Sequence, residues 1–215
     1  MKKLLPILFV LIITSYSVRG ISSDELTLDQ KTQEPFLGFS VTKDGVIFDQ
    51  ETDEPITGVI KKYYESGKLK SSSHYIDGKL NGLYESYYDN GQLSKRVNYI
   101  DEKRDGVWEV FYANGQLKYK SNYINGKING VHYGYFQDGQ LFTQEYYREG
   151  KKIGSAIQYY PDGQIHIKGN YVNGKKHGVH IEGFYEVYNK GSWEDYFVVR
   201  GCFENGTKVD MSFCD

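Results

Sequence analysis

The stretch 106-GVWEVFYANGQLKYKSNYINGKIN-129 decides the fold, because the chain spells nearly the same residues immediately before it. The preceding stretch, 82-GLYESYYDNGQLSKRVNYIDEKRD-105, aligns with it without a gap. One column of this alignment holds a glycine at every 24-residue step: Gly58, Gly82, Gly106, Gly130, Gly154 and Gly178. A period of this length indicates a repeat architecture in which each copy is one small structural unit.

Each copy contains two tight-turn motifs. The first is Asn90-Gly91, Asn114-Gly115, Asp138-Gly139 and Asp162-Gly163, and the second is Asp77-Gly78, Asn125-Gly126 and Asn173-Gly174. These dipeptides favour two-residue type I′ turns, in which both central residues need positive φ. Between them lie runs of roughly seven to nine residues, rich in aromatic and β-branched side chains, which is a normal strand length. The sequence therefore predicts an all-β fold: an elongated antiparallel β-meander of stacked 24-residue hairpin repeats, forming a single-layer twisted ribbon.

The first turn also predicts a register. With Asn114-Gly115 as the two turn residues, four cross-strand pairs follow: Tyr112 with Leu117, Val110 with Tyr119, Trp108 with Ser121, and Gly106 with Tyr123. Because side chains alternate along a strand, one face should be apolar. Its members would be Trp108, Val110, Tyr112, Leu117, Tyr119 and Tyr123, and the opposite face would carry Val107, Glu109, Phe111, Lys118, Asn122 and Ile124.

The first 20 residues have the pattern of a secretory signal peptide. Lys2 and Lys3 precede the apolar run Leu4 to Ile13, and small residues follow at Ser15, Ser17 or Gly20, where cleavage could fall. The alternative is an uncleaved membrane anchor, but a spanning helix needs about 20 apolar residues. We therefore expect an exported protein of the periplasm, the cell envelope or the extracellular medium.

Charge and cysteine content fit this location. The chain has 26 basic and 28 acidic residues, and removing Lys2, Lys3 and Arg19 with the signal peptide leaves 23 basic, a net charge of −5. An acidic protein is a poor partner for nucleic acid. In an exported chain the only two cysteines, Cys202 and Cys214, favour a disulfide over two free thiols.

The repeats divide the mature chain into three parts. Residues 21–42 form a polar N-terminal lead-in, 43–177 hold the tandem repeats, and 178–215 form a divergent last repeat with a C-terminal cap. In this last part Gly206 stands 28 residues after Gly178 where 20 are expected, so about eight residues are inserted. An atypical terminal unit is expected because the end of a repeat array must be capped.

The repeated segments resemble the bacterial variant of the MORN repeat, of the YwqK type. The residues that carry the resemblance are 82-GLYESYYDNGQLSKRVNYI-100, 106-GVWEVFYANGQLKYKSNYINGK-127 and 54-EPITGVIKKYYESGKLK-70. The resemblance implies an elongated ribbon of antiparallel hairpins and a role as scaffold, lipid contact or appendage to an enzyme. The YwqK name is linked to a putative antitoxin that neutralises a partner protein. Such a role belongs in the cytoplasm, whereas this chain begins with an export signal.

The sequence predicts no catalytic residues, no cofactor and no metal site. His132 and His180 occupy the column of Trp108 and so replace structural aromatics. The spacing His177-x-x-His180 with Glu182 could suggest metal ligands, but residues three apart on a strand point to opposite faces. There is no G-x-S-x-G motif to place a nucleophile, and we therefore do not expect an enzyme.

A recurrent aromatic row is the candidate binding site. It consists of Tyr63, Tyr87, Phe111, Tyr135 and Tyr159, which should lie on the face opposite Trp108. Exposed aromatics at a fixed repeat suit an extended protein or glycan partner, although the same rings could simply stabilise the sheet by packing on neighbours. We expect an exported scaffold that mediates protein–protein interaction; the alternatives are an antitoxin-like protein or a surface protein that contacts lipid or glycan. Membrane contact is the weaker form because no basic cluster accompanies the row.

Overall fold

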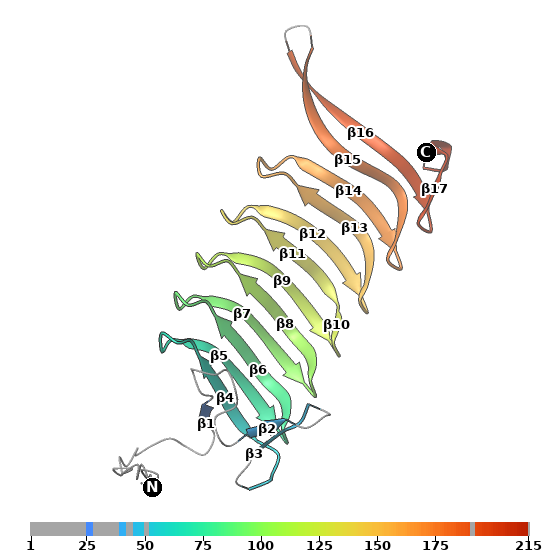
Figure 1. Ribbon diagram of the computed structural model, residues 1–215. Helices are drawn as coiled ribbons and strands as arrows, with labels where there is room; N and C mark the ends of the chain where they lie inside the picture. Colours follow the sequence, from blue (N-terminus) through green and yellow to red (C-terminus); the bar gives the residue numbers. More distant parts are fainter. Residues whose placement is uncertain (1–24, 28–38, 42–44, 50–51, 190–191, 215) are drawn as a thin grey trace, which may run out of the picture.

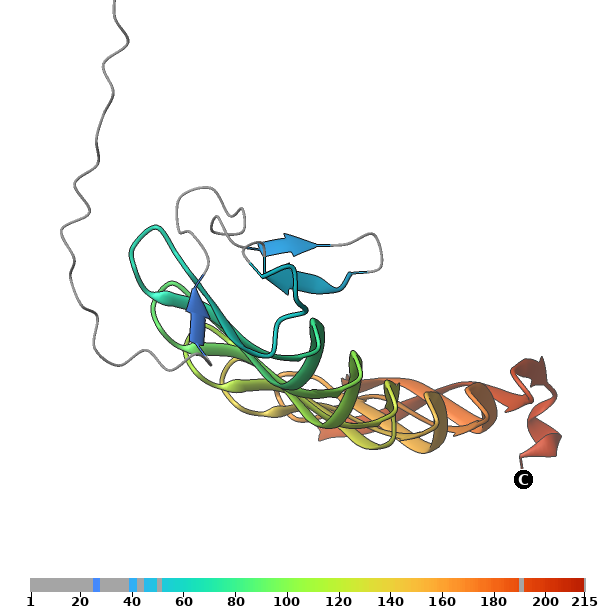
Figure 2. The same ribbon diagram turned by 90° about the horizontal axis from the view of Figure 1, so that it is seen from below.

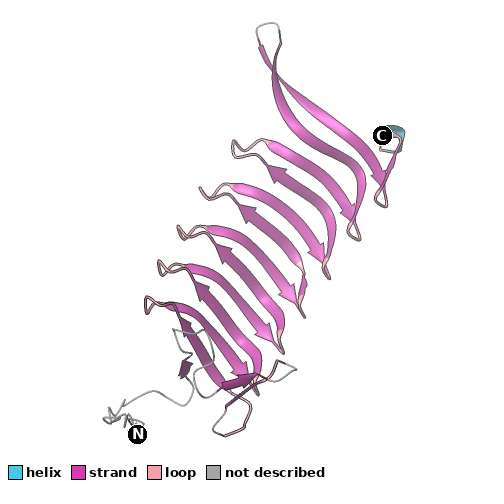
Figure 3. Ribbon diagram, in the orientation of Figure 1, coloured by secondary structure: helices cyan, strands magenta, loops and turns pink. Residues whose placement is uncertain are grey.

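A computed structural model describes residues 25–27, 39–41, 45–49, 52–189 and 192–214 of the chain. Nearly all of these residues belong to strands, and the single helical element is the short 3-10 helix η1 (Met211–Phe213) (Figure 3). The predicted signal peptide, residues 1–20, lies outside the described residues, as does most of the lead-in. Among the described residues no helix is long and apolar enough to cross a membrane.

The strands follow one another along an elongated ribbon (Figure 1). They are β1 (Glu25–Thr27), β2 (Phe39–Val41), β3 (Ile47–Asp49), β4 (Gly58–Tyr63), β5 (Leu69–Ile76), β6 (Lys79–Tyr87), β7 (Leu93–Ile100), β8 (Lys103–Phe111), β9 (Leu117–Ile124), β10 (Lys127–Ile128), β11 (Gly130–Tyr135), β12 (Leu141–Arg148), β13 (Lys151–Tyr159), β14 (Ile165–Val172), β15 (Lys175–Asn189), β16 (Ser192–Glu204) and β17 (Thr207–Val209). From β4 to β17 each strand pairs antiparallel with the next, apart from the short β10, which pairs with β9 beside β11. The predicted all-β meander is confirmed.

The first strand of the sheet departs from the meander. β1 pairs in parallel with β4, with Glu25 opposite Val59 and Thr27 opposite Lys61. It covers the backbone edge that the first repeat would otherwise expose, and an unpaired edge is a template for unwanted strand pairing. β2 and β3 form a separate two-stranded sheet.

The two long edges of the ribbon use different turns. At the second turn the prediction of type I′ is confirmed, since both Asn125 and Gly126 have positive φ, at 50° and 80°. At the first turn the same prediction is wrong. Within Ala113-Asn114-Gly115 only the glycine has positive φ, at 85°. The N–H of Gly115 donates to the Tyr112 carbonyl at 2.9 Å, and the N–H of Tyr112 donates to Gln116 at 2.8 Å. This is a three-residue loop, a type I turn completed by a left-handed glycine.

The longer loop shifts the register beside it. The predicted pairs Gly106–Tyr123, Trp108–Ser121 and Val110–Tyr119 are confirmed, but Leu117 pairs with Phe111 instead of Tyr112. A bulge between Val110 and Phe111 absorbs the difference. Leu117 therefore lies on the Phe111 side, and Lys118 on the Trp108 side with its Nζ over the rings of Tyr112 and Tyr119. The two assignments of Leu117 and Lys118 to faces were wrong because a bulge reverses alternation locally.

The ribbon is curved across its strands, so that one face is concave (Figure 2). Ile47 of β3 and Tyr75 of β5 both pack against Ile56 and Ile60, and the β2–β3 hairpin lies on the open side of the curve. Ile60 and Tyr75 belong to the columns that include Trp108 and Tyr123, two repeats further along the chain. The face that carries Trp108 is therefore the concave one. Its side chains converge, and its central column Ser73, Val97, Ser121 and Glu145 is 7%, 1%, 2% and 8% exposed.

The C-terminal end of the ribbon is stapled. The expected disulfide joins Cys202 on β16 to Cys214 after η1, with a Cα–Cα distance of 6.0 Å. The lengthened last repeat takes the form of a long hairpin: β15 pairs with β14 only up to Glu182, while its pairing with β16 continues to Asn189. Beyond Glu182 this hairpin projects from the ribbon as two strands (Figure 1).

Candidate interaction surfaces

The predicted aromatic row runs along one edge of the convex face. Tyr63, Tyr87, Phe111, Tyr135 and Tyr159 occupy equivalent positions, each paired with the Leu or Ile that follows the first turn. All five side chains are half-buried. Tyr87 donates its hydroxyl to Glu85 at 2.8 Å, and the rings of Tyr133 and Tyr135 stack at 6.3 Å. The structure thus brings the row together opposite Trp108, where the rings also pack on their neighbours.

Charged pairs occupy the centre of the convex face. Arg96 donates to Glu85 at 2.7 Å, and Lys120 donates to Glu109 at 3.0 Å. Burial alone would raise the pKa of the Glu85 carboxyl, but hydrogen bonds from Arg96 and Tyr87 outweigh it and lower that pKa. These cross-strand pairs neutralise their own charges, as expected for opposite charges facing each other on a sheet.

An exposed aliphatic stripe borders these charges at the edge with the type I′ turns. Seven of the nine exposed large apolar side chains in the described chain lie on the convex face: Ile76, Leu83, Ile100, Val107, Ile124, Tyr146 and Val172. We call the six aliphatic residues among them, all except Tyr146, the aliphatic stripe. Ile76, Ile100 and Ile124 stand at one column of the repeat and are 48%, 49% and 47% exposed. Exposed apolar side chains gathered on one face of a folded protein commonly mark an interaction site.

A row of lysines accompanies the stripe. The isoleucines of the leading column pair across the strands with lysines, Ile76 with Lys79, Ile100 with Lys103 and Ile124 with Lys127. The same position holds Lys151 and Lys175 in the later repeats. All five lysines are exposed. The surface therefore offers alternating apolar and cationic groups along the length of the ribbon.

The concave face contains a buried polar cluster that the sequence did not suggest. Glu145 is 8% exposed, and its carboxylate accepts hydrogen bonds from Lys152 and from Tyr147, both at 2.7 Å. Burial would raise the pKa of Glu145, but these two hydrogen bonds lower it. The pKa of Tyr147 is raised, first by burial and then by its bond to Glu145. Each member is satisfied by another, which is what burying polar groups requires.

Ser121, His132 and Glu145 meet on neighbouring strands of this face. The Ser121 hydroxyl and His132 Nδ1 are 2.7 Å apart, and His132 pairs with Glu145 across the strands. Burial lowers the pKa of His132. The residue types are those of a nucleophile, a base and an acid, but Ser121 is 2% exposed, and the Glu145 carboxylate is held by Lys152 and Tyr147. The arrangement therefore resembles a satisfied structural network more than a reactive one.

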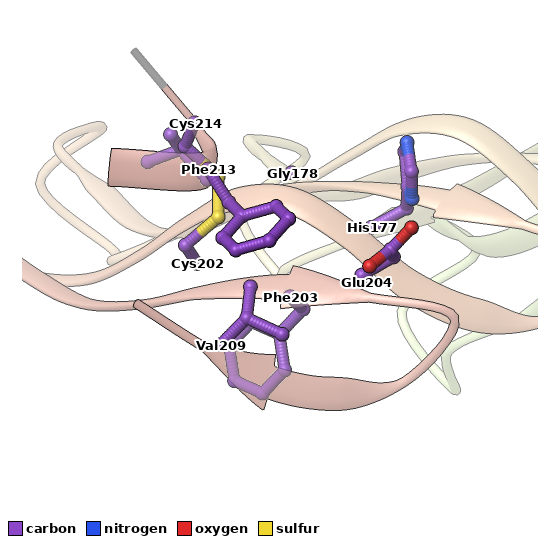
Figure 4. Close-up of a pocket in the computed structure, with 9 residues that line it drawn as sticks. His177, Gly178, Cys202, Phe203, Glu204, Val209, Phe213 and Cys214 are labelled. Atoms are coloured by element: carbon purple, nitrogen blue, oxygen red, sulfur yellow. A yellow bond between two sulfur atoms is a disulfide. The ribbon is translucent and has the colours of Figure 1, made fainter. Parts of the chain in front are cut away.

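The two histidines whose spacing could suggest a metal site, His177 and His180, have other contacts. His180 is 1% exposed and bonds through Nε2 to the Asn170 carbonyl at 2.9 Å, so this nitrogen is the donor. His177 lines a pocket of about 160 Å³ beside the disulfide, together with Cys202, Phe203, Glu204 and Phe213 among others (Figure 4). Within the described residues no group of three or more His, Cys, Asp or Glu is placed to hold a metal ion.

The comparison with known families follows this geometry closely. Four segments match the model of the MORN repeat variant: residues 56–77, 80–101, 104–125 and 152–173. Each segment covers one hairpin joined by the first turn. The chain is a MORN-repeat protein. Repeats of this family generally mediate contacts with proteins or membranes. The narrower YwqK-type assignment stays a prediction, and no curated protein matches the chain.

Proposed function

We propose that this MORN-repeat protein is an exported, non-enzymatic scaffold that binds another protein through its convex face. The observation that carries the proposal is the aliphatic stripe, which exposes the same residue positions in successive repeats. Repetition of one contact every two strands, about 10 Å, suits an elongated partner. The aromatic row Tyr63, Tyr87, Phe111, Tyr135 and Tyr159 borders the same face and would widen the contact.

The location follows from separate features. The Cys202–Cys214 disulfide favours a compartment outside the reducing cytosol. The pattern of residues 1–20 supports export to the periplasm, the cell envelope or the medium. Fractionation of the producing cells, with mass measurement of the mature N-terminus, tests this part. Recovery of the full-length chain in the cytoplasm with both thiols free would contradict it.

Site-specific crosslinking tests the binding surface. A photo-crosslinking amino acid at Ile100 or Val107 should capture the same partner protein in the native compartment, while one at the exposed residue Ser212 of the C-terminal cap should not. Replacing Ile76 and Ile124 by Ser should remove that crosslink and leave the melting temperature nearly unchanged, because exposed positions contribute little to stability. A crosslink of equal strength from Ser212, or capture of lipid alone from Ile100, would contradict the proposal.

A further inference from the structure

Four cations on the concave face lie over aromatic rings and have no carboxylate partner in the part of the chain that the structure describes. Lys70 lies 5.5 Å from the ring centroid of Tyr64, and Lys95 lies 5.0 Å from that of Tyr84. Arg104 lies 4.0 Å from the ring centroid of Tyr123. Lys118 lies 5.2 Å from the ring centroid of Tyr112 and 5.5 Å from that of Tyr119. The ion pairs within the described residues do not include any of the four. Cation–π contact supports such a charge only in part, so these groups can still take an anion.

Other cations of the sheet either pair with a carboxylate or, like the lysine row of the convex edge, are exposed to solvent. On the convex face of the same repeats Arg96 and Lys120 are each paired with a glutamate. Further along the concave face Lys152 is paired with Glu145 at 2.7 Å. On the concave side of β5 to β9 these four half-buried cations therefore lie in one hollow without a carboxylate partner among the described residues, although the chain as a whole has a net charge of −2. Burial, and then the proximity of Arg104, lower the pKa of Lys95, so an anion bound there would relieve mutual repulsion.

The neighbouring part of the hollow shows what kind of molecule fits it. At the first repeat the hollow contains polypeptide of this chain, with Ile47 packed against Ile56 and Ile60 (Figure 2). Backbone groups hold this segment: Ile47 N–H donates to the Gly78 carbonyl at 2.9 Å, and Ile56 N–H donates to the Ile47 carbonyl at 3.0 Å. Over the next two repeats, β6 to β9, the described chain places no such segment.

We propose that the concave face of β6 to β9 binds an extended acidic segment of another polypeptide, whose carboxylates pair with Lys95, Arg104 and Lys118. The remaining side chains of that segment lie against Tyr84, Trp108 and Tyr119. Lys95 and Lys118 belong to consecutive repeats, which are about 10 Å apart. A chain in the extended polyproline II conformation rises about 3.1 Å per residue with three residues per turn, so that every third side chain points the same way. The best ligand therefore has an acidic residue at every third position. This surface is separate from the aliphatic stripe, so each proposal can fail without the other.

Fluorescence anisotropy with the purified protein tests the proposal. The probe is a labelled 13-residue peptide with Glu at every third position among Thr and Tyr, and the control peptide has Lys in place of Glu. The Glu peptide should bind, with affinity falling at least about tenfold between 50 and 200 mM salt, and the Lys peptide should not. Lys95→Glu, Arg104→Glu and Lys118→Glu together should weaken binding at least about 100-fold.

The matched control makes the same change of charge on the other face. Lys103→Glu, Lys127→Glu and Lys151→Glu together should change the affinity less than about threefold. If the concave triple variant fails to fold, Lys95→Met with Lys118→Met keeps the packing of both side-chain stems and should still weaken binding at least about tenfold. Equal losses from the two triple variants, no binding of the Glu peptide, or tighter binding of polygalacturonate or phosphatidylglycerol vesicles would overturn the proposal.

Discussion

The two faces of the ribbon are built from the same strands and yet perform different physical tasks. On the concave face curvature drives side chains together, and Val97 and Ser121 are 1% and 2% exposed. On the convex face the strands spread the side chains apart, and Ile100 and Ile124, three residues further along the same strands, are 49% and 47% exposed. A single-layer sheet has no second layer to cover it, so curvature alone decides which face forms the core. The concave face therefore supplies most of the buried surface, whereas the convex face keeps apolar side chains exposed.

The largest predicted difference in stability is between two variants that each truncate one side chain of the same strand, one on the concave face and one on the convex face. Trp108 stacks on Tyr119 at 6.3 Å and meets Tyr123 edge-on at 6.2 Å, whereas its neighbour Val107 is 47% exposed. Trp108→Ala should lower the free energy of unfolding by about 3 kcal/mol. Val107→Ala should lower it by less than about 0.5 kcal/mol. Urea unfolding followed by tyrosine fluorescence and circular dichroism measures both, and similar losses would show that the two faces do not differ in burial.

Acid should weaken the concave face first. Burial lowers the pKa of His132 and of His180 below the ordinary value of 6.5, so the unfolded chain binds protons that the folded chain does not. The stability from keeping these rings neutral is complete above pH 6.5 and is lost progressively as the pH falls below it. Glu145 and Lys152 face His132, and the pKa of Glu145 is itself lowered, so a further loss follows below its ordinary value of 4.5.

Replacing His132 by Tyr, the residue at the equivalent position 84, tests that acid response. The free energy of unfolding should fall less between pH 7 and pH 5 in the variant than in the parent protein. Replacing the exposed convex residue Lys127 by Gln serves as the control and should leave the pH profile unchanged. A profile that is the same in His132→Tyr and in the parent would contradict the assigned role of this ring.

The smallest predicted change in stability concerns two copies of the second turn, one with glutamate and one with glycine at the same position. At the second turn Glu102 has a φ of 63°, where the other repeats have glycine. A non-glycine residue in the left-handed region carries strain, so Glu102→Gly should raise the free energy of unfolding by about 0.5–1 kcal/mol. The converse change Gly126→Glu, at a φ of 80°, should lower it by a similar amount. Thermal melts of the two variants measure the pair, and a loss of stability in Glu102→Gly would contradict the assigned strain.

The sequence predicted the meander, the repeat and most of the register because period, turn dipeptides and alternation are local properties. It misjudged the first turn because Asn-Gly serves two turn types. Asn114 Oδ1 accepts a hydrogen bond from the N–H of Gln116 at 3.1 Å, and this favours the longer loop. The alternation pattern already placed Val107 and Ile124 opposite Trp108. That they are exposed depends on the curvature of the whole sheet, which no 24-residue window contains.

Labelling of introduced cysteines tests most directly whether the faces are divided in this way. Both native cysteines are in the disulfide, so each new thiol can be followed alone. Val97→Cys and Ser121→Cys should react with a soluble maleimide at least about tenfold more slowly than Ile100→Cys and Ile124→Cys, because labelling at the first two sites needs local opening of the sheet. Equal rates at the four positions, or faster labelling at 97 and 121 than at 100 and 124, would contradict the account.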